Sequence, residues 1–477
     1  MSRFYFILVL LCSGFFSANL IAQKGYQIDF QIEAYAAQEV YLAYFYGDKQ
    51  ILKDTIVATK NQQFSIRGTS PLTAGVYMLV LAPDQKRIQF IVPEEDQHFS
   101  VRMDTSTQVS RIHFEGSEAN ELYYDFLTKK EKQAQALEAF EKTTQKEGTT
   151  LDTTRRAQLL AEQVAFQAEQ VALVKKYPET ILAALIGMSW EIEVPSFTGS
   201  PAEEIAFVQQ YHQYHYFDHT PLYASFFLRL PGGYQKVDYF INGLSPAGIS
   251  PLSLKYPEAI KSALTIVLDK MQENRKVFKF YLTHFINKYG NAKIVGMDAV
   301  FVHLVENYVL SGAADWVKGA SLNTVKKLAS KRKPLLNGKV APNITMQLES
   351  GESIALHDVE AAYTILVFWR PNCGHCKKAI PAIQSFYEAH RAEGVKVFAP
   401  CTWIQDKTPQ CWSDAKEKGM EDFINVVDPK MKSKFLSLYD IQTTPRVFLL
   451  DKDKRILIKR IASEELENIF QKIKSLP

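Results

Sequence analysis

The chain has 477 residues, of which 47% are hydrophobic and 22% are charged. These fractions are ordinary for globular proteins, and they exclude wholesale disorder, a collagen and a coiled coil. At roughly 100–200 residues per domain, the length predicts two to four domains. The net charge of +3 is too small for an electrostatic nucleic-acid footprint, so nucleic acid is not an expected partner.

The first 22 residues are predicted to be a secretory signal peptide. Arg3 is the only charged residue before Lys24, and an apolar run over residues 4–11 is followed by small and apolar residues up to Ala22. A basic start, an apolar core and a small residue at the end are typical of a cleaved export signal. We expect cleavage after Ala22, which leaves Gln23 as the first mature residue.

Two alternatives for this segment remain open. Cys12 could be lipidated, although Leu10 and Leu11 stand where a lipidation signal requires small residues. The segment could also stay as an uncleaved membrane anchor. No other stretch approaches the ~18–20 apolar residues of a spanning helix. The mature chain is therefore expected to be exported, without a membrane span after signal cleavage, and either soluble or tethered at its N-terminus.

Residues 23–117 are predicted to form a small antiparallel β-sandwich. Apolar and polar residues alternate strictly over residues 26–33, which is the period of a strand with one face in water. Short runs of this kind, separated by turn residues, recur about every ten residues, as in sandwiches. They cover residues 40–46, 51–57, 64–67, 76–82, 88–92, 99–103 and 112–114.

Residues 118–332 are predicted to form a helical domain. Residues 119–146 and 153–176 are rich in the strong helix formers Ala, Glu, Gln, Lys and Leu, and the part from 128 to 176 is expected to be an exposed helical hairpin. Further helical patterns cover residues 202–217, 257–271, 277–288, 297–310 and 322–330. The basic stretch 326–333 and the segment 331–338 are interpreted as a solvated linker.

Residues 333–477 are predicted to form an α/β domain, because strands and helices alternate there. The expected order is strand 364–369, helix 373–392, strand 395–399, helix 409–418, strands 446–450 and 455–459 joined by a turn, and helix 463–474.

The chemistry is predicted at the first strand-to-helix junction of this domain, which reads Cys373-Gly374-His375-Cys376. A cysteine at a helix N-terminus faces unpaired backbone N–H groups, which favour the thiolate. Cys373 is therefore the predicted nucleophile, and Cys376, one turn later, is the predicted resolving thiol. We hypothesise that His375 as imidazolium stabilises the thiolate further and makes the pair more oxidising, so that His375→Pro would lower the potential.

The surrounding residues resemble a thioredoxin-fold active site. Trp369 stands four residues before the first cysteine and Pro381 five residues after the second, and the segment from Tyr439 to Pro445 matches the family's Tyr-x-Ile-x-x-x-Pro pattern. The resemblance implies that Pro445 is cis and faces the cysteines. A cis proline also exposes the Thr444 backbone for β-like pairing with a substrate chain. No cofactor is implied.

Some residues depart from the family pattern. Val367 replaces a buried aspartate that aids proton transfer, so the resolving step either lacks that base or uses Glu388, water or another group. Asn372 replaces the usual tryptophan before the first cysteine. The long spacing to Pro445 includes Cys401 and Cys411 and resembles the exported TlpA/ResA-like branch.

The whole arrangement resembles envelope proteins of the Bacteroidota. These join a small β domain and a helical domain, both of unknown function, to a TlpA-like thioredoxin domain. Residues 289–302 and 216–219 resemble the helical domain. The resemblance implies the periplasm or cell envelope of a Gram-negative bacterium.

Competing interpretations exist for several of these residues. Cys373, Cys376, Cys401 and Cys411, with His375, could bind zinc, but the spacing of Cys401 and Cys411 is unlike a zinc knuckle. Cys401 and Cys411 are either a second disulfide or free thiols. A second candidate metal cluster consists of His212, His215, His219 and Asp218, but an amphipathic helix with histidines at its rim explains the pattern more simply. We therefore expect no metal.

Two functions are compatible with the sequence. The first is an exported thiol–disulfide oxidoreductase that acts on protein cysteines and is served by an upstream redox partner of the envelope. The second is a redox-inert binding or structural protein that keeps the thioredoxin fold as a scaffold. Two exposed cysteines at a helix start would favour the first. The sequence leaves the direction open among reduction, oxidation and isomerisation.

Overall fold

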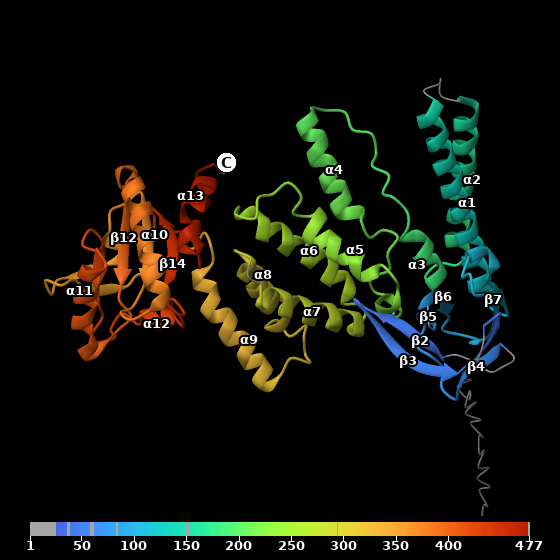
Figure 1. Ribbon diagram of the computed structural model, residues 1–477, viewed down its shortest axis with the longest axis horizontal. Helices are drawn as coiled ribbons and strands as arrows, with labels where there is room; N and C mark the ends of the chain where they lie inside the picture. Colours follow the sequence, from blue (N-terminus) through green and yellow to red (C-terminus); the bar gives the residue numbers. More distant parts are fainter. Residues whose placement is uncertain are drawn as a thin grey trace, which may run out of the picture. The chain divides into compact units, whose positions relative to one another are not determined.

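The computed structural model describes residues 25–35, 39–57, 62–82, 84–147, 153–292 and 294–475 (Figure 1). The predicted signal peptide, with Cys12, lies outside these residues. The chain divides into two compact units. The first extends to Ser189 and includes Leu228–Pro231, and the second comprises Trp190–Phe227 and Gly232–Pro477. In the described part of the chain, no helix combines the length and the apolar character needed to cross a membrane.

The N-terminal part of the first unit is a sandwich of two four-stranded sheets, with strand orders β4-β1-β7-β8 and β3-β2-β5-β6. Phe30 in the first sheet packs against Phe90 in the second, with ring centroids 5.8 Å apart. The strands are β1 (Tyr26–Glu33), β2 (Glu39–Tyr46), β3 (Lys49–Val57), β4 (Gln63–Gly68), β5 (Gly75–Leu81), β6 (Lys86–Val92), β7 (His98–Asp104) and β8 (His113–Glu115).

The predicted sandwich is confirmed, but one pairing differs from an all-antiparallel arrangement. Strands β1 and β7 pair in parallel. Between them the chain passes through both sheets, so β7 enters the first sheet in the same direction as β1. Strands that follow each other in sequence usually pair, whereas the pairing of β1 with β7 joins segments about seventy residues apart.

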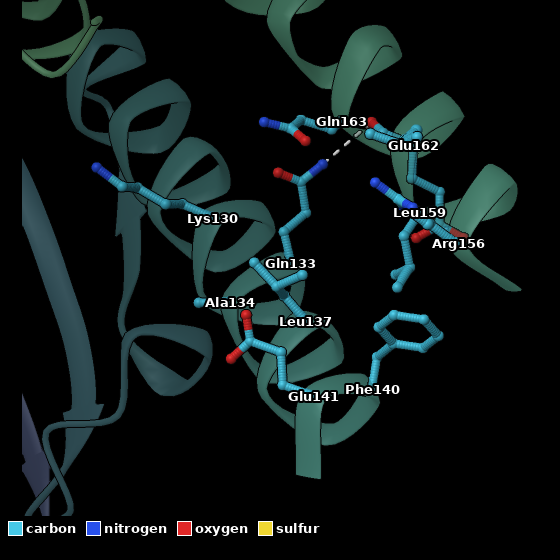
Figure 2. Close-up of a pocket in the computed structure, with 11 residues that line it drawn as sticks. Lys130, Gln133, Ala134, Leu137, Phe140, Glu141, Arg156, Leu159, Glu162 and Gln163 are labelled. Carbon is cyan, nitrogen blue, oxygen red and sulfur yellow. Dashed lines mark hydrogen bonds between the residues drawn. The ribbon is translucent and has the colours of Figure 1, made fainter. Parts of the chain in front are cut away.

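Three helices complete the first unit: α1 (Glu118–Glu147), α2 (Thr153–Lys176) and α3 (Ile181–Gly187). Asn120 fixes α1 to strand β6, because its side chain exchanges two hydrogen bonds with the Ile91 backbone, at 2.7 and 2.8 Å. Helix α2 buries none of its residues, which agrees with the expected exposed hairpin. A pocket of about 350 Å³ lies between α1 and α2, where Gln133 donates a 3.0 Å hydrogen bond to the Glu162 carbonyl (Figure 2).

The second unit begins with a set of helices, of which the sixth, seventh and eighth of the chain bury an apolar face. They are α4 (Pro201–His215), α5 (Gly233–Tyr239), α6 (Lys255–Met271), α7 (Arg275–Gly290), α8 (Met297–Leu304) and α9 (Gly319–Arg332). Helix α8 continues as a π-helical turn over Val305–Val309, where a single α-helix was expected. Helices α3 and α5 were not predicted, since seven residues are too few to show a periodic pattern.

The prediction of a solvated basic linker is wrong. Helix α9 extends to Arg332, and the residues at its end have partners. Lys331 forms an ion pair with Asp440 at 3.0 Å, and Lys333 forms one with Glu306 at 2.6 Å. Leu335 is buried. Carboxylates distant in sequence neutralise this stretch, and its composition alone does not reveal them.

The last part of the second unit has a five-stranded sheet in the order β13-β12-β11-β14-β15. Strand β11 pairs in parallel with β12 and antiparallel with β14. The elements are β9 (Thr345–Gln347), β10 (Ser353–Ala355), β11 (Tyr363–Phe368), α10 (Gly374–His390), β12 (Val395–Pro400), α11 (Thr408–Glu417), β13 (Ile424–Val426), α12 (Phe435–Leu438), β14 (Arg446–Asp451), β15 (Ile456–Lys459) and α13 (Leu466–Lys474).

The central strand β11 is buried on both faces. Ile365 and Val367 belong to the apolar cluster that contains Ile383 of α10, whereas Leu366 and Phe368 belong to the opposite cluster. Successive residues of a strand point to opposite faces, so an uninterrupted apolar run fills both. The sheet is thus fixed between two packed layers, and the end of β11 becomes a rigid support for the cysteines.

Candidate active site

The two cysteines of the Cys-Gly-His-Cys motif lie where β11 gives way to α10. The chain turns through Asn372, whose φ of 55° is left-handed and is tolerated by asparagine. Cys373 is the N-cap of α10, and its sulfur accepts a 3.2 Å hydrogen bond from the backbone N–H of Cys376. Gly374 is the first residue of the helix and Pro381 lies inside it.

The loop before β14 covers the Cys373 sulfur. The peptide bond between Thr444 and Pro445 is cis, as the resemblance implied. The Cys373 thiol donates to the Thr444 carbonyl at 3.3 Å, and the Thr444 hydroxyl donates back to the sulfur at 3.5 Å. The sequence pointed to the Thr444 backbone but not to its hydroxyl, although a hydroxyl residue before the cis proline is the signal that could have found it.

These contacts separate the acidities of the two thiols. Burial raises the pKa of Cys373. Hydrogen bonds from Cys376, from Thr444 and from the amides of Cys376 and His375 outweigh that effect, so the pKa lies below its usual value. Burial and the hydrogen bond with Cys373 raise the pKa of Cys376 to about 12. One cysteine is therefore prepared as a thiolate, while the other holds its proton.

The expectation of two exposed cysteines is wrong. Only 6% of Cys373 and none of Cys376 is accessible, because the cis-proline loop and the apolar cluster enclose the sulfurs. His375 is exposed. Its backbone amide favours the Cys373 thiolate, but in the described structure its imidazole makes no contact with that sulfur. The role of the imidazole charge stays a prediction.

The floor of the site is apolar. Val367 belongs to the same buried cluster as both cysteines, so no carboxylate stands there. Glu388 is exposed and lies 3.5 Å from Arg391. It follows Cys376 by twelve helical residues, a rise of about 18 Å. The suggestion that Glu388 serves as the base for Cys376 is therefore wrong.

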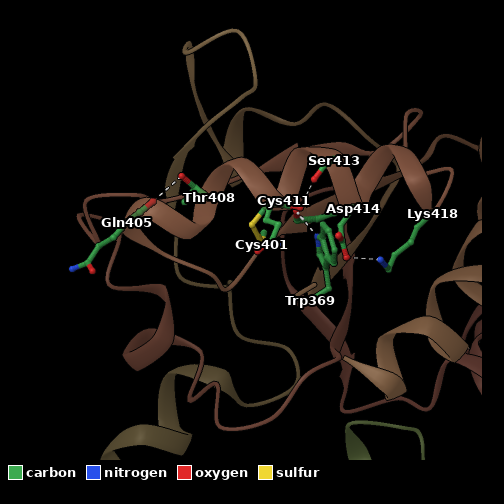
Figure 3. The surroundings of a disulfide bond; sticks show 10 residues. Trp369, Cys401, Gln405, Thr408, Cys411, Ser413, Asp414 and Lys418 are labelled. Carbon is green, nitrogen blue, oxygen red and sulfur yellow. Dashed lines mark hydrogen bonds and ion pairs between the residues drawn. A yellow bond between two sulfur atoms is a disulfide. The ribbon is translucent and has the colours of Figure 1, made fainter. Parts of the chain in front are cut away.

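The second cysteine pair lies behind the active site. Cys401 and Cys411 are joined in a disulfide, which ties the end of β12 to α11 and removes the thiolates that a four-cysteine zinc site would need. Trp369 lies beside this disulfide (Figure 3). Its backbone accepts from Thr402 at 2.7 Å and its indole donates to the Ala399 carbonyl at 3.3 Å. The disulfide and Trp369 therefore brace the strand that leads to Cys373.

The histidine cluster does not form a metal site. Helix α4 ends at His215, so His219 does not continue the helical face. His215 hydrogen-bonds Asp218 at 2.7 Å, and the His219 ring packs against Trp190 with centroids 4.6 Å apart. Across the ranges that the structure describes, no three His, Cys, Asp or Glu side chains gather as metal ligands.

Comparisons with known proteins agree with this site. Residues 337–458 match the AhpC/TSA family, and residues 26–123 match the domain of unknown function DUF4369. The thiol-disulfide oxidoreductase ResA of Bacillus cereus is 28% identical over 145 residues, which cover 28% of this chain and 78% of the relative. The sporulation thiol-disulfide oxidoreductase A of Bacillus subtilis is 29% identical over 161 residues, covering 34% and 90%.

A solved structure gives a similar match. A domain of a possible thiol-disulfide isomerase from Cytophaga hutchinsonii shares 38% identity, covering 30% of this chain and 95% of that domain, with a TM-score of 0.28. The matched segments coincide with the sandwich and with the sheet that carries the cysteines. The part of the chain that carries the cysteines therefore matches the AhpC/TSA family and is similar to ResA-like thiol–disulfide oxidoreductases, and the N-terminal sandwich matches DUF4369.

Proposed function

We propose that this protein is an exported enzyme that exchanges disulfides with the cysteines of protein substrates through Cys373 and Cys376. The observation that carries the proposal is the difference between the two thiols. Cys373 has a lowered pKa and keeps some exposure, whereas Cys376 is fully buried with a raised pKa. An attacking thiol must be ionised and accessible, and a resolving thiol must stay protonated until the mixed disulfide has formed.

The exchange proceeds in two steps. The Cys373 thiolate attacks one sulfur of a substrate disulfide, a bond forms between them, and the other substrate sulfur leaves as a thiolate that takes a proton. Cys376 then loses its proton and attacks the Cys373 sulfur, which releases the second substrate thiol. Two electrons pass from the enzyme dithiol to the substrate, and the reverse sequence oxidises a substrate dithiol.

The second step depends on deprotonating Cys376. With Val367 below the cysteines and Glu388 distant, we assign the proton to water or to the departing substrate thiolate. An upstream dithiol or disulfide partner of the envelope must restore the starting state. The proposed export rests on the N-terminal signal pattern.

The test is to trap the mixed disulfide. In Cys376→Ser the second step is blocked, so the mature protein is expected to retain covalently bound substrate proteins after expression in the envelope. Dithiothreitol should reduce the mixed disulfide and release the bound substrate proteins. The matched control is the Cys373→Ser, Cys376→Ser double variant, which should retain none. If Cys376→Ser also traps nothing, and the wild type does not reduce insulin, the chain is the redox-inert scaffold instead.

A further inference from the structure

A polar pocket of about 410 Å³ lies within the second unit, where the loop before α8 meets the end of β15. Of the described residues that line it, three carry positive charges, namely Arg332, Lys459 and Arg460, and Asp298 alone is acidic. We call it the cationic pocket. Its remaining lining includes Gly290 and other residues of the loop, so backbone groups make up much of the wall.

The single carboxylate is already occupied. Lys459 is only 7% exposed, and its ammonium group binds both the Asp298 carboxylate and the Leu335 carbonyl. A buried ammonium requires such partners, because an unpaired charge in the interior is costly. Lys459 therefore holds the Asp298 carboxylate, and three cations of the lining share this one acidic residue.

The two arginines are incompletely satisfied. Arg332 donates to the Gly290 carbonyl at 3.0 Å and lies over the Phe301 ring at 4.8 Å, but its buried Nε has no hydrogen-bond partner. The Arg460 side chain is exposed and has no ion-pair or hydrogen-bond partner within the described ranges. Burial, and then repulsion from Arg460, lower the pKa of Arg332, and attraction to the Asp298 and Asp440 carboxylates opposes this effect only in part.

The N-terminus of helix α8 adds partial positive charge at the cationic pocket. The helix begins beside the pocket, and its N-cap is Gly296, which offers no side chain to the first-turn N–H groups. A helix N-terminus carries partial positive charge. A cavity that gathers unpaired guanidinium donors and a helix N-terminus fits an oxyanion, and guanidinium groups bind carboxylates in bidentate fashion.

A backbone hydrogen bond links the pocket lining to the strand that follows the loop over Cys373. Arg460 donates its backbone N–H to the Val447 carbonyl at 2.9 Å. Val447 lies three residues, or about 10 Å of extended chain, beyond Thr444, which contacts the Cys373 sulfur. Arg446 lies between them, and its Nε is also buried without a partner. Arg446, Arg460 and Arg332 thus lie near one another, and the Asp440 carboxylate beside Arg446 and Arg332 is itself paired with Lys331.

We propose that the cationic pocket binds a carboxylate of an acidic protein substrate whose cysteine is engaged at Cys373. This inference rests on the proposed function, since it names a substrate class for that site. The bound carboxylate would pair with the Arg460 guanidinium and supply an acceptor for the unsatisfied Nε of Arg332. Substrates with acidic residues near the reacting cysteine would be preferred over neutral ones.

The test measures binding without redox chemistry. Two labelled peptides carry serine in place of the substrate cysteine and differ only in two flanking glutamates or two glutamines. Fluorescence anisotropy with the reduced full-length mature protein gives both affinities. We expect the acidic peptide to bind about tenfold more tightly, and the advantage to shrink in high salt, which screens exposed charges. In Arg460→Gln the advantage should disappear, whereas in the exposed control Lys472→Gln it should remain.

The outcomes separate this inference from the proposed function. Equal affinities for the two peptides, or an acidic preference that persists in Arg460→Gln, would overturn it even if Cys376→Ser traps substrates. Inorganic phosphate should compete with the acidic peptide. If phosphate binds and the peptides do not differ, the pocket is a site for a free oxyanion and the substrate assignment is wrong. A failure to trap substrates would instead refute the exchange function itself.

Discussion

The Thr444 hydroxyl gives the clearest quantitative prediction. It donates to the Cys373 sulfur at 3.5 Å, and a donor stabilises the thiolate more than the thiol. Thr444→Val removes the donor while keeping the branched shape. The cis peptide bond and the Thr444 carbonyl, which accepts from the thiol, are left in place. The variant is therefore expected to raise the pKa of Cys373.

The size of the effect follows from the geometry. A hydrogen bond to a charged group contributes about 1.5–3 kcal/mol, and this long contact with sulfur should fall below that range, at about 1 kcal/mol. Since 1.36 kcal/mol corresponds to one pKa unit, the pKa of Cys373 should rise by about 0.7. If the variant's pKa lies above neutrality, the thiolate fraction at pH 7 falls by up to about fivefold.

The assay is the rate of alkylation by iodoacetamide as a function of pH in the Cys376→Ser background, where Cys373 is the only free thiol among the cysteines of the described residues. Thr443→Val is the matched control, because that side chain is exposed. An unchanged midpoint in Thr444→Val, or an equal rise in Thr443→Val, would refute the assignment of the hydroxyl as a thiolate donor.

Three further predictions concern stability. Replacing Cys401 and Cys411 by alanine opens a short loop and should lower the free energy of unfolding in urea by about 2–3 kcal/mol; an unchanged midpoint would mean that the bond does not form in solution. Asp298→Ala should cost about 3–5 kcal/mol, because it leaves the Lys459 ammonium buried without its carboxylate, and a near-neutral result in thermal unfolding would contradict the buried pair. Burial opposes the charge on His390, but the hydrogen bonds that its ring donates to the Glu467 and Glu393 carboxylates raise its pKa. The stability that its imidazolium contributes is therefore complete below the unfolded pKa of about 6.5 and is lost as the pH rises through the folded value. His390→Gln should flatten this part of the melting temperature profile, and a profile as steep as that of wild type would rule the histidine out.

The cysteine site could be predicted from the sequence because short local motifs define it. A Cys-x-x-C motif after an apolar run fixes a helix start and an order of attack, and the segment ending in Pro445 placed the covering loop. The donors to the sulfur depend on a contact between Cys373 and Thr444, which are 71 residues apart. A local sequence pattern does not predict the rotamer of the Thr444 hydroxyl, so its contact with the sulfur is known only from the structure.

Longer-range features were less predictable for the same reason. The parallel pairing of β1 with β7 depends on how the chain crosses between two sheets. The partner of Lys459 is 161 residues away, and the carboxylates that pair with Lys331 and Lys333 are 109 and 27 residues away, so the basic stretch was interpreted as solvated. Charge composition indicates how many ions a segment carries, but only the fold decides which of them remain unpaired, as in the cationic pocket.

The most direct test of the account is to identify which cysteine reacts first. The mature protein, with Cys373 and Cys376 reduced and the Cys401–Cys411 disulfide intact, is treated at pH 7 with iodoacetamide below one equivalent, and the modified peptide is identified by mass spectrometry. The account predicts modification almost entirely at Cys373, with Cys376 protected by burial and by its raised pKa. Equal labelling of the two cysteines, or labelling mainly at Cys376, would contradict it.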